Sequence, residues 1–406
     1  MFQKSTLLRY ASVMAGVGLF ALPGVSRAGE FETSLSAFSD ITYGVLRGKP
    51  AQATQGAAFG AGGEDAFVKN SNQGFGLVGT DFVLTTELDD RFVYLAEVNL
   101  QAARGRKDEI ELDVERMFLE YRILPQLNIQ AGLFFTPIGY FNRNLYARAW
   151  MMISAQIPDL FEEENNFVPT HTTGVHAHGI FDLGRSHLLK YAVSVGNGRN
   201  TSPDKAVYAR DDDGWRTTTA MLEWLVPAFR STTLGVSGWY DRISSFYIPT
   251  VGGGDSTLNP AAQGLRLTEV GVDAHLAIFS NHVNLIGEYL YQQHRDRDNV
   301  LPATERNGAL QGAFVELSAN LLSTGALKPY VRFDYVKLPQ TNGGPYLGLR
   351  GDGDDVVRVF VPRTAMLMGG LSYDFAPRVR VKVEYSEALA GARAKHGLML
   401  QTAFAF

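Results

Sequence analysis

Two histidines that are one residue apart, His176 and His178, are the side chains in this sequence whose type and spacing first suggest chemistry. In a strand both imidazoles would lie on one face, and His171 and His187 are close in sequence. Imidazole is a common metal ligand, so a metal site is one interpretation. The interpretation we favour is a pair of polar side chains facing a wet interior, and we expect no bound metal and no cofactor.

The patterns of nucleophilic catalysis are missing from the sequence. It contains no cysteine and no Gly-x-Ser-x-Gly segment, and no convincing Ser/His/acid set emerges. His282 lies in a predicted short turn, which makes it a poor catalytic base. We therefore expect no catalytic residues and no enzymatic activity.

The N-terminus has the features of an export signal. Lys4 and Arg9 accompany an apolar segment over 11–22, and small residues typical of a cleavage site end at Ala28. The apolar segment is too short for a membrane anchor. We expect residues 1–28 to be a signal peptide and 29–406 to form one domain that begins at Gly29.

Charge and cysteine content exclude several classes of protein. The sequence carries a net charge of −5, and residues 1–28 hold three basic residues and no acidic one, so the mature chain carries about −8. This balance argues against nucleic-acid binding. Without cysteine the exported chain has no disulfides, so other interactions must hold it together.

Alternating apolar and polar residues predict strands through most of the chain. After residue 28 no apolar run approaches the ~20 residues of a membrane helix, and a membrane protein without such helices must be a closed barrel. We count sixteen strands, near residues 31–43, 75–88, 92–103, 109–123, 127–135, 172–183, 187–198, 215–226, 231–245, 265–279, 283–294, 308–322, 326–338, 357–375, 379–390 and 396–406.

The connections between these strands mostly alternate between short and long. Turns such as 89–91 and 184–186 alternate with segments such as 44–74 and 136–171, as in barrels with short periplasmic turns and longer external loops. Aromatic residues near the short turns predict an interfacial girdle: Phe92, Tyr121, Phe181, Trp224, Phe229, Phe279, Tyr373 and Phe375.

Charged residues alternate with apolar ones along several predicted strands. A charge facing lipid costs about 2–4 kcal/mol at the membrane centre, so the charged face must point into a wet interior. The phase breaks at Glu115-Arg116, where we predict a β-bulge. The predicted inward set comprises Glu97, Glu269, Asp273, Glu316, Arg332, Asp334, Arg380, Lys382 and Glu384.

The final strand, 396–406, ends on Phe406, and we expect it to pair with 31–43 and close the barrel. An exported, cysteine-free, sixteen-stranded chain with a terminal Phe resembles the porins of Gram-negative bacteria. Residues 132–142, Gly-Leu-Phe-Phe-Thr-Pro-Ile-Gly-Tyr-Phe-Asn, resemble the G-x-F-x-T-P-x-G segment of phosphate-selective-type and related porins. The negative charge and the missing Arg/Lys ladder depart from phosphate selectivity.

The resemblance implies an antiparallel transmembrane β-barrel in the outer membrane whose long third external loop, 136–171, folds into the lumen. Residues 146–156 could form a short helix there. The run Glu162-Glu163-Glu164 would place acid opposite Arg332, Arg380 and Lys382, and such opposed charges create a transverse field that sorts solutes. The alternative is an external loop with a solvated acidic run.

The expected function is passive diffusion of small hydrophilic solutes or ions through a water-filled barrel. Expected partners are outer-membrane lipid and lipopolysaccharide, the barrel-assembly machinery and, by resemblance only, two further copies in a homotrimer. Acidic, glycine-rich stretches at 211–214 and 352–355 are more readily solvated turns than Ca²⁺ sites or divalent bridges to lipopolysaccharide. The alternatives are a barrel enzyme, an adhesion or structural barrel with a plugged lumen, and a soluble secreted all-β protein.

Overall fold

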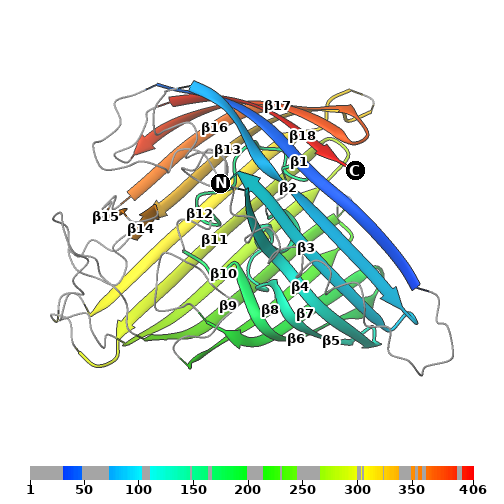
Figure 1. The fold of residues 1–406 in the computed structure, drawn as a ribbon, viewed down its shortest axis with the longest axis vertical. Helices are drawn as coiled ribbons and strands as arrows, with labels where there is room; N and C mark the ends of the chain where they lie inside the picture. The colour runs from blue at the N-terminus through cyan, green and yellow to red at the C-terminus, as the bar shows by residue number, and fades with distance from the viewer. Residues whose placement is uncertain are drawn as a thin grey trace, which may run out of the picture.

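The fold is a closed antiparallel barrel, seen in a computed structural model (Figure 1). The structure describes residues 31–47, 73–102, 110–146, 149–162, 167–198, 214–228, 231–244, 266–299, 303, 306–322, 324–337, 349–352, 355–358, 363–390 and 396–406. The expected signal peptide lies outside these residues. Among them, no helix is both long and apolar enough to cross a membrane.

Sixteen strands form the barrel in the described part of the chain, as the sequence predicts. They are β1 (Phe31–Arg47), β2 (Gln73–Leu88), β3 (Phe92–Ala102), β4 (Ile110–Leu124), β5 (Leu127–Phe135), β6 (His171–Gly184), β7 (His187–Asn197), β8 (Arg216–Val226), β9 (Ser231–Ser244), β10 (Arg266–Phe279), β11 (Val283–Asp296), β12 (Asn307–Ala319), β13 (Leu327–Lys337), β16 (Arg363–Ala376), β17 (Val379–Ala390) and β18 (His396–Ala405).

The last strand closes the barrel on the first. β18 pairs antiparallel with β1, with Ile41 opposite Thr402 and Phe38 opposite Ala405. Gln401 is buried and donates a hydrogen bond of 2.7 Å to Asp40 of β1, whereas Phe406 is 65% exposed. The predicted pairing and the two predicted faces of this strand are confirmed.

Polarity is inverted relative to a soluble barrel. On β10, Val270 and Val272 are 45% and 51% exposed on the outside, while Glu269 and Asp273 are buried inside. Only a non-aqueous surrounding makes such an exterior stable, because exposed apolar surface of this extent is unfavourable in water. The barrel therefore spans a membrane and keeps its charged side chains inside.

Two local features of the wall are a bulge in β4 and an aromatic girdle near the short turns. β4 contains the predicted bulge, because Glu97 pairs with Arg116 and Val98 with Val114, which leaves Glu115 as the extra residue. The predicted aromatic girdle is confirmed only in part. Phe279 packs inward against the apolar cluster of the interior, since it shares the β10 face that carries Glu269 and Asp273, and Phe229 lies outside the described residues.

Two elements were not predicted. A two-stranded sheet, β14 (Leu349–Asp352) with β15 (Asp355–Arg358), lies outside the barrel order. The helix expected over 146–156 is wrong: one turn of helix, α3 (Phe141–Asn144), precedes that position, and the described residues from 149 to 156 form turns and bends. Carbonyl oxygens there accept hydrogen bonds from wall side chains, which a helix would instead use internally.

Candidate functional site in the barrel interior

The segment after β5 is fixed to the wall at its start through backbone N–H groups. Tyr140 and Phe141 donate to the two carboxylate oxygens of Glu288 on β11, at 3.1 and 2.5 Å, and Gly139 donates to the Ser237 hydroxyl at 3.0 Å. Burial, followed by the nearby Glu223 carboxylate, raises the pKa of Tyr140 to about 12, so this phenol is neutral.

Gly139 is the last glycine of the G-x-F-x-T-P-x-G segment, and its backbone conformation and surroundings explain why glycine is required there. Its φ of 62° is in the left-handed region that favours glycine. A Cβ there would lie 2.2 Å from Oε2 of Glu288. Both the turn and the close approach of the chain to the Glu288 carboxylate therefore require a residue without a side chain.

A second set of contacts holds the middle of the same segment. Arg332 donates to the carbonyl oxygens of Gln156 and Ile157, at 2.5 and 3.3 Å. Lys382 donates to the carbonyl oxygen of Ser154 at 2.8 Å, and Arg380 to that of Trp150 at 2.7 Å.

These three cations were predicted to face the acidic run across an open channel. The structure places Arg332, Arg380 and Lys382 beneath the segment, with exposures of 1%, 8% and 0%. Burying a cation is costly unless its donors find partners, and here loop carbonyls accept hydrogen bonds from all three side chains. Glu162 is also buried, and Glu163 and Glu164 lie outside the described residues.

An apolar cluster lies between the segment and β9 to β13. Phe141 stacks with Phe161, at 5.5 Å between ring centroids, and both rings meet Phe314 of β12 edge-on. Ile138 and Leu160 complete its centre with exposures of 0% and 1%. Hydrophobic burial thus adds to the polar anchors on this side of the barrel.

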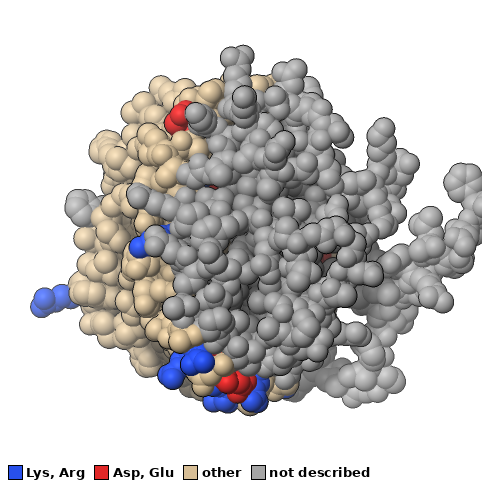
Figure 2. Space-filling view, turned by 90° about the vertical axis from the view of Figure 1, so that its left-hand side faces the viewer, with Lys and Arg blue, Asp and Glu red and all other residues tan. Residues whose placement is uncertain are grey.

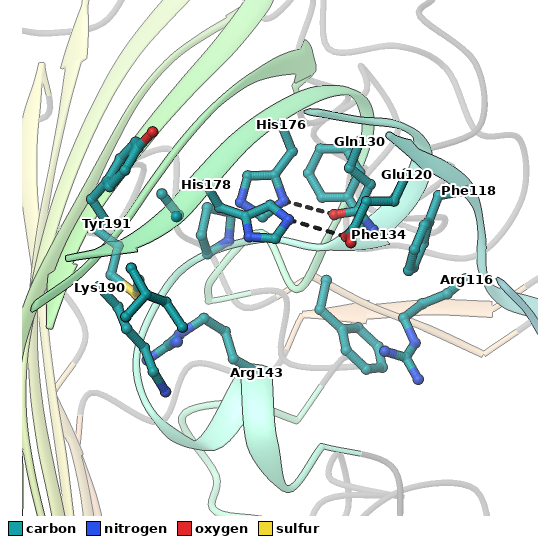
Figure 3. Close-up of a pocket in the computed structure, with 16 residues that line it drawn as sticks. Arg116, Phe118, Glu120, Gln130, Phe134, Arg143, His176, His178, Lys190 and Tyr191 are labelled. Atoms are coloured by element: carbon teal, nitrogen blue, oxygen red, sulfur yellow. Dashed lines mark hydrogen bonds and ion pairs between the residues drawn. The ribbon is translucent and has the colours of Figure 1, made fainter. Parts of the chain in front are cut away.

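A cavity of about 300 Å³ lies on the opposite side, between the segment and strands β4 to β8 (Figure 3). Its wall mixes charged and polar side chains with aromatic and aliphatic ones. The side chains that matter most to its chemistry are those of Arg116, Phe118, Glu120, Gln130, Phe134, Arg143, His176, His178, Lys190 and Met221.

The two histidines that first suggested chemistry belong to this cavity. Nδ1 of His176 lies 2.9 Å from the Gln130 amide oxygen, and Nε2 of His178 lies 3.1 Å from the Glu120 carboxylate. His176 also stacks on Phe134, with centroids 5.1 Å apart. Their partners and position agree with polar residues facing the interior, the interpretation that the sequence favoured.

Basic side chains border the cavity on two sides. Figure 3 shows Arg143 and Lys190 together on one side and Arg116 on the other. Arg116 contacts Glu97 at 2.5 Å, Arg143 pairs with Glu223, and Lys190 lies 3.4 Å from the same Glu223. Glu97 and Glu223 are buried behind these cations, whereas the Glu120 carboxylate itself lines the cavity, so three cations and one carboxylate border it.

A cluster with metal-ligating types lies deeper in the wall. Ligand atoms of Asp273, His275 and Glu288 all lie within 4.8 Å of one another. Both ring nitrogens of His275 already face carboxylates, Asp273 at 3.1 Å and Glu223 at 3.3 Å, and both oxygens of Glu288 accept N–H groups of the segment. The cluster therefore holds the beginning of the segment against the barrel wall.

The structure places nine of the predicted inward-facing residues inside the barrel. Glu97, Glu269, Asp273, Glu316, Arg332, Asp334, Arg380, Lys382 and Glu384 all lie inside and are buried. The analysis of the sequence missed Arg116, Glu120, Arg143, Lys190, Glu223 and Glu288. Alternation could have placed Glu223 inward, since Thr217, Thr219 and Met221 are buried with it, whereas no local pattern indicates Arg143.

No protein-family model and no curated protein matches this sequence. Several solved structures resemble the fold. OmpT of Vibrio cholerae in a trimer form has a TM-score of 0.58 at 11% identity over 93% of this chain and 99% of its own. An anion-selective porin from Comamonas acidovorans has 0.53 at 8%, over 93% and 100%. OmpF of Salmonella typhi, in complex with daunomycin, has 0.52 at 11%, over 92% and 97%.

The exclusion of enzymatic activity, drawn from the sequence, does not hold. OmpT structures stand first among these neighbours, at about 10% identity. A likeness at that level shows a shared barrel and leaves enzymatic activity open.

The neighbours agree with the location that the sequence predicts. They are outer-membrane barrels, and the apolar exterior and closed strand order of this chain fit the outer membrane of a Gram-negative bacterium. The chain has the sixteen-strand, porin-type fold.

Proposed function

We propose that this protein is an outer-membrane channel through which small hydrophilic solutes or ions diffuse passively. The observation that carries the proposal is the cavity of about 300 Å³ between the anchored segment and β4 to β8. Four charged side chains, Arg116, Glu120, Arg143 and Lys190, stand in its lining among apolar ones, so it can admit water and small charged or polar solutes.

The anchored segment is the constriction of this channel. Contacts with Glu288 and Ser237 fix its beginning, and contacts with Arg332, Arg380 and Lys382 fix its middle, all against inward-facing side chains. A segment held at both places can narrow the lumen permanently. It leaves the β4 to β8 side as the passage.

The remaining features of the proposal concern export and assembly. Residues 1–28 act as a signal peptide, and the mature domain is assembled into the membrane by the barrel-assembly machinery. Lipid and lipopolysaccharide then surround it. A homotrimer is supported by OmpT, of which a trimer form is among the similar structures.

Planar-bilayer recording tests the channel directly. Residues 29–406, refolded from denaturant into detergent, should give discrete steps whose current is proportional to voltage. Detergent without protein and heat-unfolded protein serve as controls. A membrane that stays silent with protein shown to be folded by circular dichroism would contradict the proposal.

A further inference from the structure

Four apolar side chains lie on the inward face of β4 to β8, a face that carries charged groups on other strands of the barrel. Phe118, Phe134, Ile180 and Met221 all line the cavity, and none of them belongs to the apolar cluster between the anchored segment and β9 to β13. Ile180 is 39% exposed although it shares a strand face with His178. Apolar surface that faces a wet interior gains free energy when an apolar part of a solute covers it.

Rings and cations occupy different parts of the cavity wall. Figure 3 shows Phe134, His176 and His178 next to one another along the upper side, with Arg143 and Lys190 together below them. The ring of His176 stacks on Phe134 at 5.1 Å between centroids and lies 4.9 Å from the ring of His178. A solute that contacts both parts of the wall therefore has a charged end and a separate apolar body.

The two lower cations share one buried carboxylate. Glu223, 2% exposed, pairs with Arg143 through Oε2, and its Oε1 lies 3.4 Å from Nζ of Lys190. Nε2 of His275 also lies 3.3 Å from the same carboxylate. One negative charge thus faces two positive side chains, so this side of the cavity attracts an anion.

Both cations keep hydrogen-bond donors for a solute. Nε of Arg143 donates to the Gly139 carbonyl at 2.8 Å and its Nη2 donates to Glu223, which leaves Nη1 without a partner among the described residues. The Lys190 side chain is 34% exposed, and its ammonium group has three donors. A carboxylate accepts charge-assisted hydrogen bonds from both kinds of group.

The acidic side chain of the cavity limits a solute to one negative charge. Glu120 lies beside the rings, where its two oxygens contact His178 at 3.1 Å and Arg122 at 3.4 Å. A second anionic group on the solute would approach this carboxylate and be repelled. The volume of about 300 Å³ is at the lower end of the roughly 300–1,000 Å³ of small-molecule sites, so the cavity suits one small solute.

We infer that the cavity is a binding subsite for small organic carboxylates that carry one negative charge and an apolar body the size of a single ring. The carboxylate lies at Arg143 and Lys190, and the apolar body lies against Phe134, Ile180 and Met221. This inference deepens the proposed function and rests on it for the route by which a solute reaches the cavity.

Isothermal titration calorimetry of residues 29–406, refolded into detergent, tests the subsite with benzoate, acetate and benzylamine as probes. Benzoate should bind at least about tenfold more tightly than acetate, which lacks the ring, and than benzylamine, which carries the opposite charge. The K190Q variant should lose roughly tenfold in affinity for benzoate, because a donor to the carboxylate is removed. The I180T/M221Q variant should lose about fivefold for benzoate and keep its affinity for acetate.

The matched control is I129T/L222Q, which makes similar changes on the outward faces of β5 and β8. Ile129 and Leu222 are 39% and 48% exposed there, on an outer wall whose described part is largely free of charged side chains in Figure 2. This variant should bind benzoate like the wild type. All variants should migrate as folded, heat-modifiable barrels, and I180T alone replaces the double variant if the latter does not fold.

Three results would overturn the subsite: equal affinity for benzoate and either other probe, unchanged benzoate binding in both K190Q and the Ile180 variant, or the same loss in I129T/L222Q. The bilayer recording without benzoate separates this inference from the proposed channel. Protein that conducts but shows no preference for benzoate leaves the channel standing and removes the subsite. Protein that binds benzoate as expected but never conducts removes the channel and keeps the subsite.

Discussion

Arg332 on β13 donates a hydrogen bond of 2.5 Å to the carbonyl oxygen of Gln156, a residue 176 positions earlier in the chain. Its side chain is fully buried and also lies 3.0 Å from Asp334. The guanidinium thus joins the wall to the segment that crosses the interior.

Replacing Arg332 by Met should release the middle of the segment. The Asp334 carboxylate would stay buried without its partner, and removal of one member of a buried pair costs about 3–5 kcal/mol. We expect a lower free energy of unfolding in urea, together with larger and noisier single-channel steps. The exposed Arg378 is the control, because R378Q should change neither quantity. Wild-type step size in a destabilised R332M variant would show that the segment does not limit conductance.

Lys190 should influence ion preference, because its amino group borders the cavity and its side chain is 34% exposed. The variant K190E should shift the reversal potential in a KCl gradient toward cation preference. K190Q, which removes the charge without adding an acid, should lie between K190E and the wild type. Identical reversal potentials for all three proteins would mean that ions do not pass this side chain.

The G139A variant should be destabilised for two separable reasons. Gly139 has a positive φ, and the added Cβ would approach Glu288 to 2.2 Å. We expect a loss of about 2 kcal/mol or more in urea unfolding, since a left-handed conformation alone costs roughly 1 kcal/mol for alanine. Gly184 has a φ of 81° with no atom within 4 Å of its Cβ position, so G184A measures the backbone part alone. Equal losses would argue against the contact with Glu288.

Lysine substitutions at Val272 and Val283 test where the lipid-facing surface lies relative to the bilayer centre. Val272 is 51% exposed near the middle of β10, whereas Val283, 45% exposed, opens β11 next to a short turn. In phospholipid vesicles V272K should lower the free energy of unfolding by about 2–4 kcal/mol and V283K by about 0–1 kcal/mol, because the cost of a charge falls toward the interface. A larger loss for V283K than for V272K would place the bilayer elsewhere on the barrel.

The sequence by itself determined the wall of this protein. A strand repeats every two residues, and a membrane on one side with a polar interior on the other forces apolar and charged residues to alternate. For that reason the strand number, the bulge at Glu115, the closing pair of β1 with β18 and the inward face of Arg332 or Lys382 could all be predicted. These features depend on local order along one strand or on its immediate neighbour.

Only the tertiary structure decided what the inward charges do. Arg332, Arg380 and Lys382 look alike in sequence whether they border water or lie beneath a segment, and the choice depends on carbonyl groups some 180 to 230 residues away. Those carbonyls accept side-chain donors instead of forming the predicted helix. The cavity lined by Arg116, Lys190 and the two histidines is the space that this packing leaves open. No periodic pattern in the sequence indicates where a folded segment lies inside the barrel.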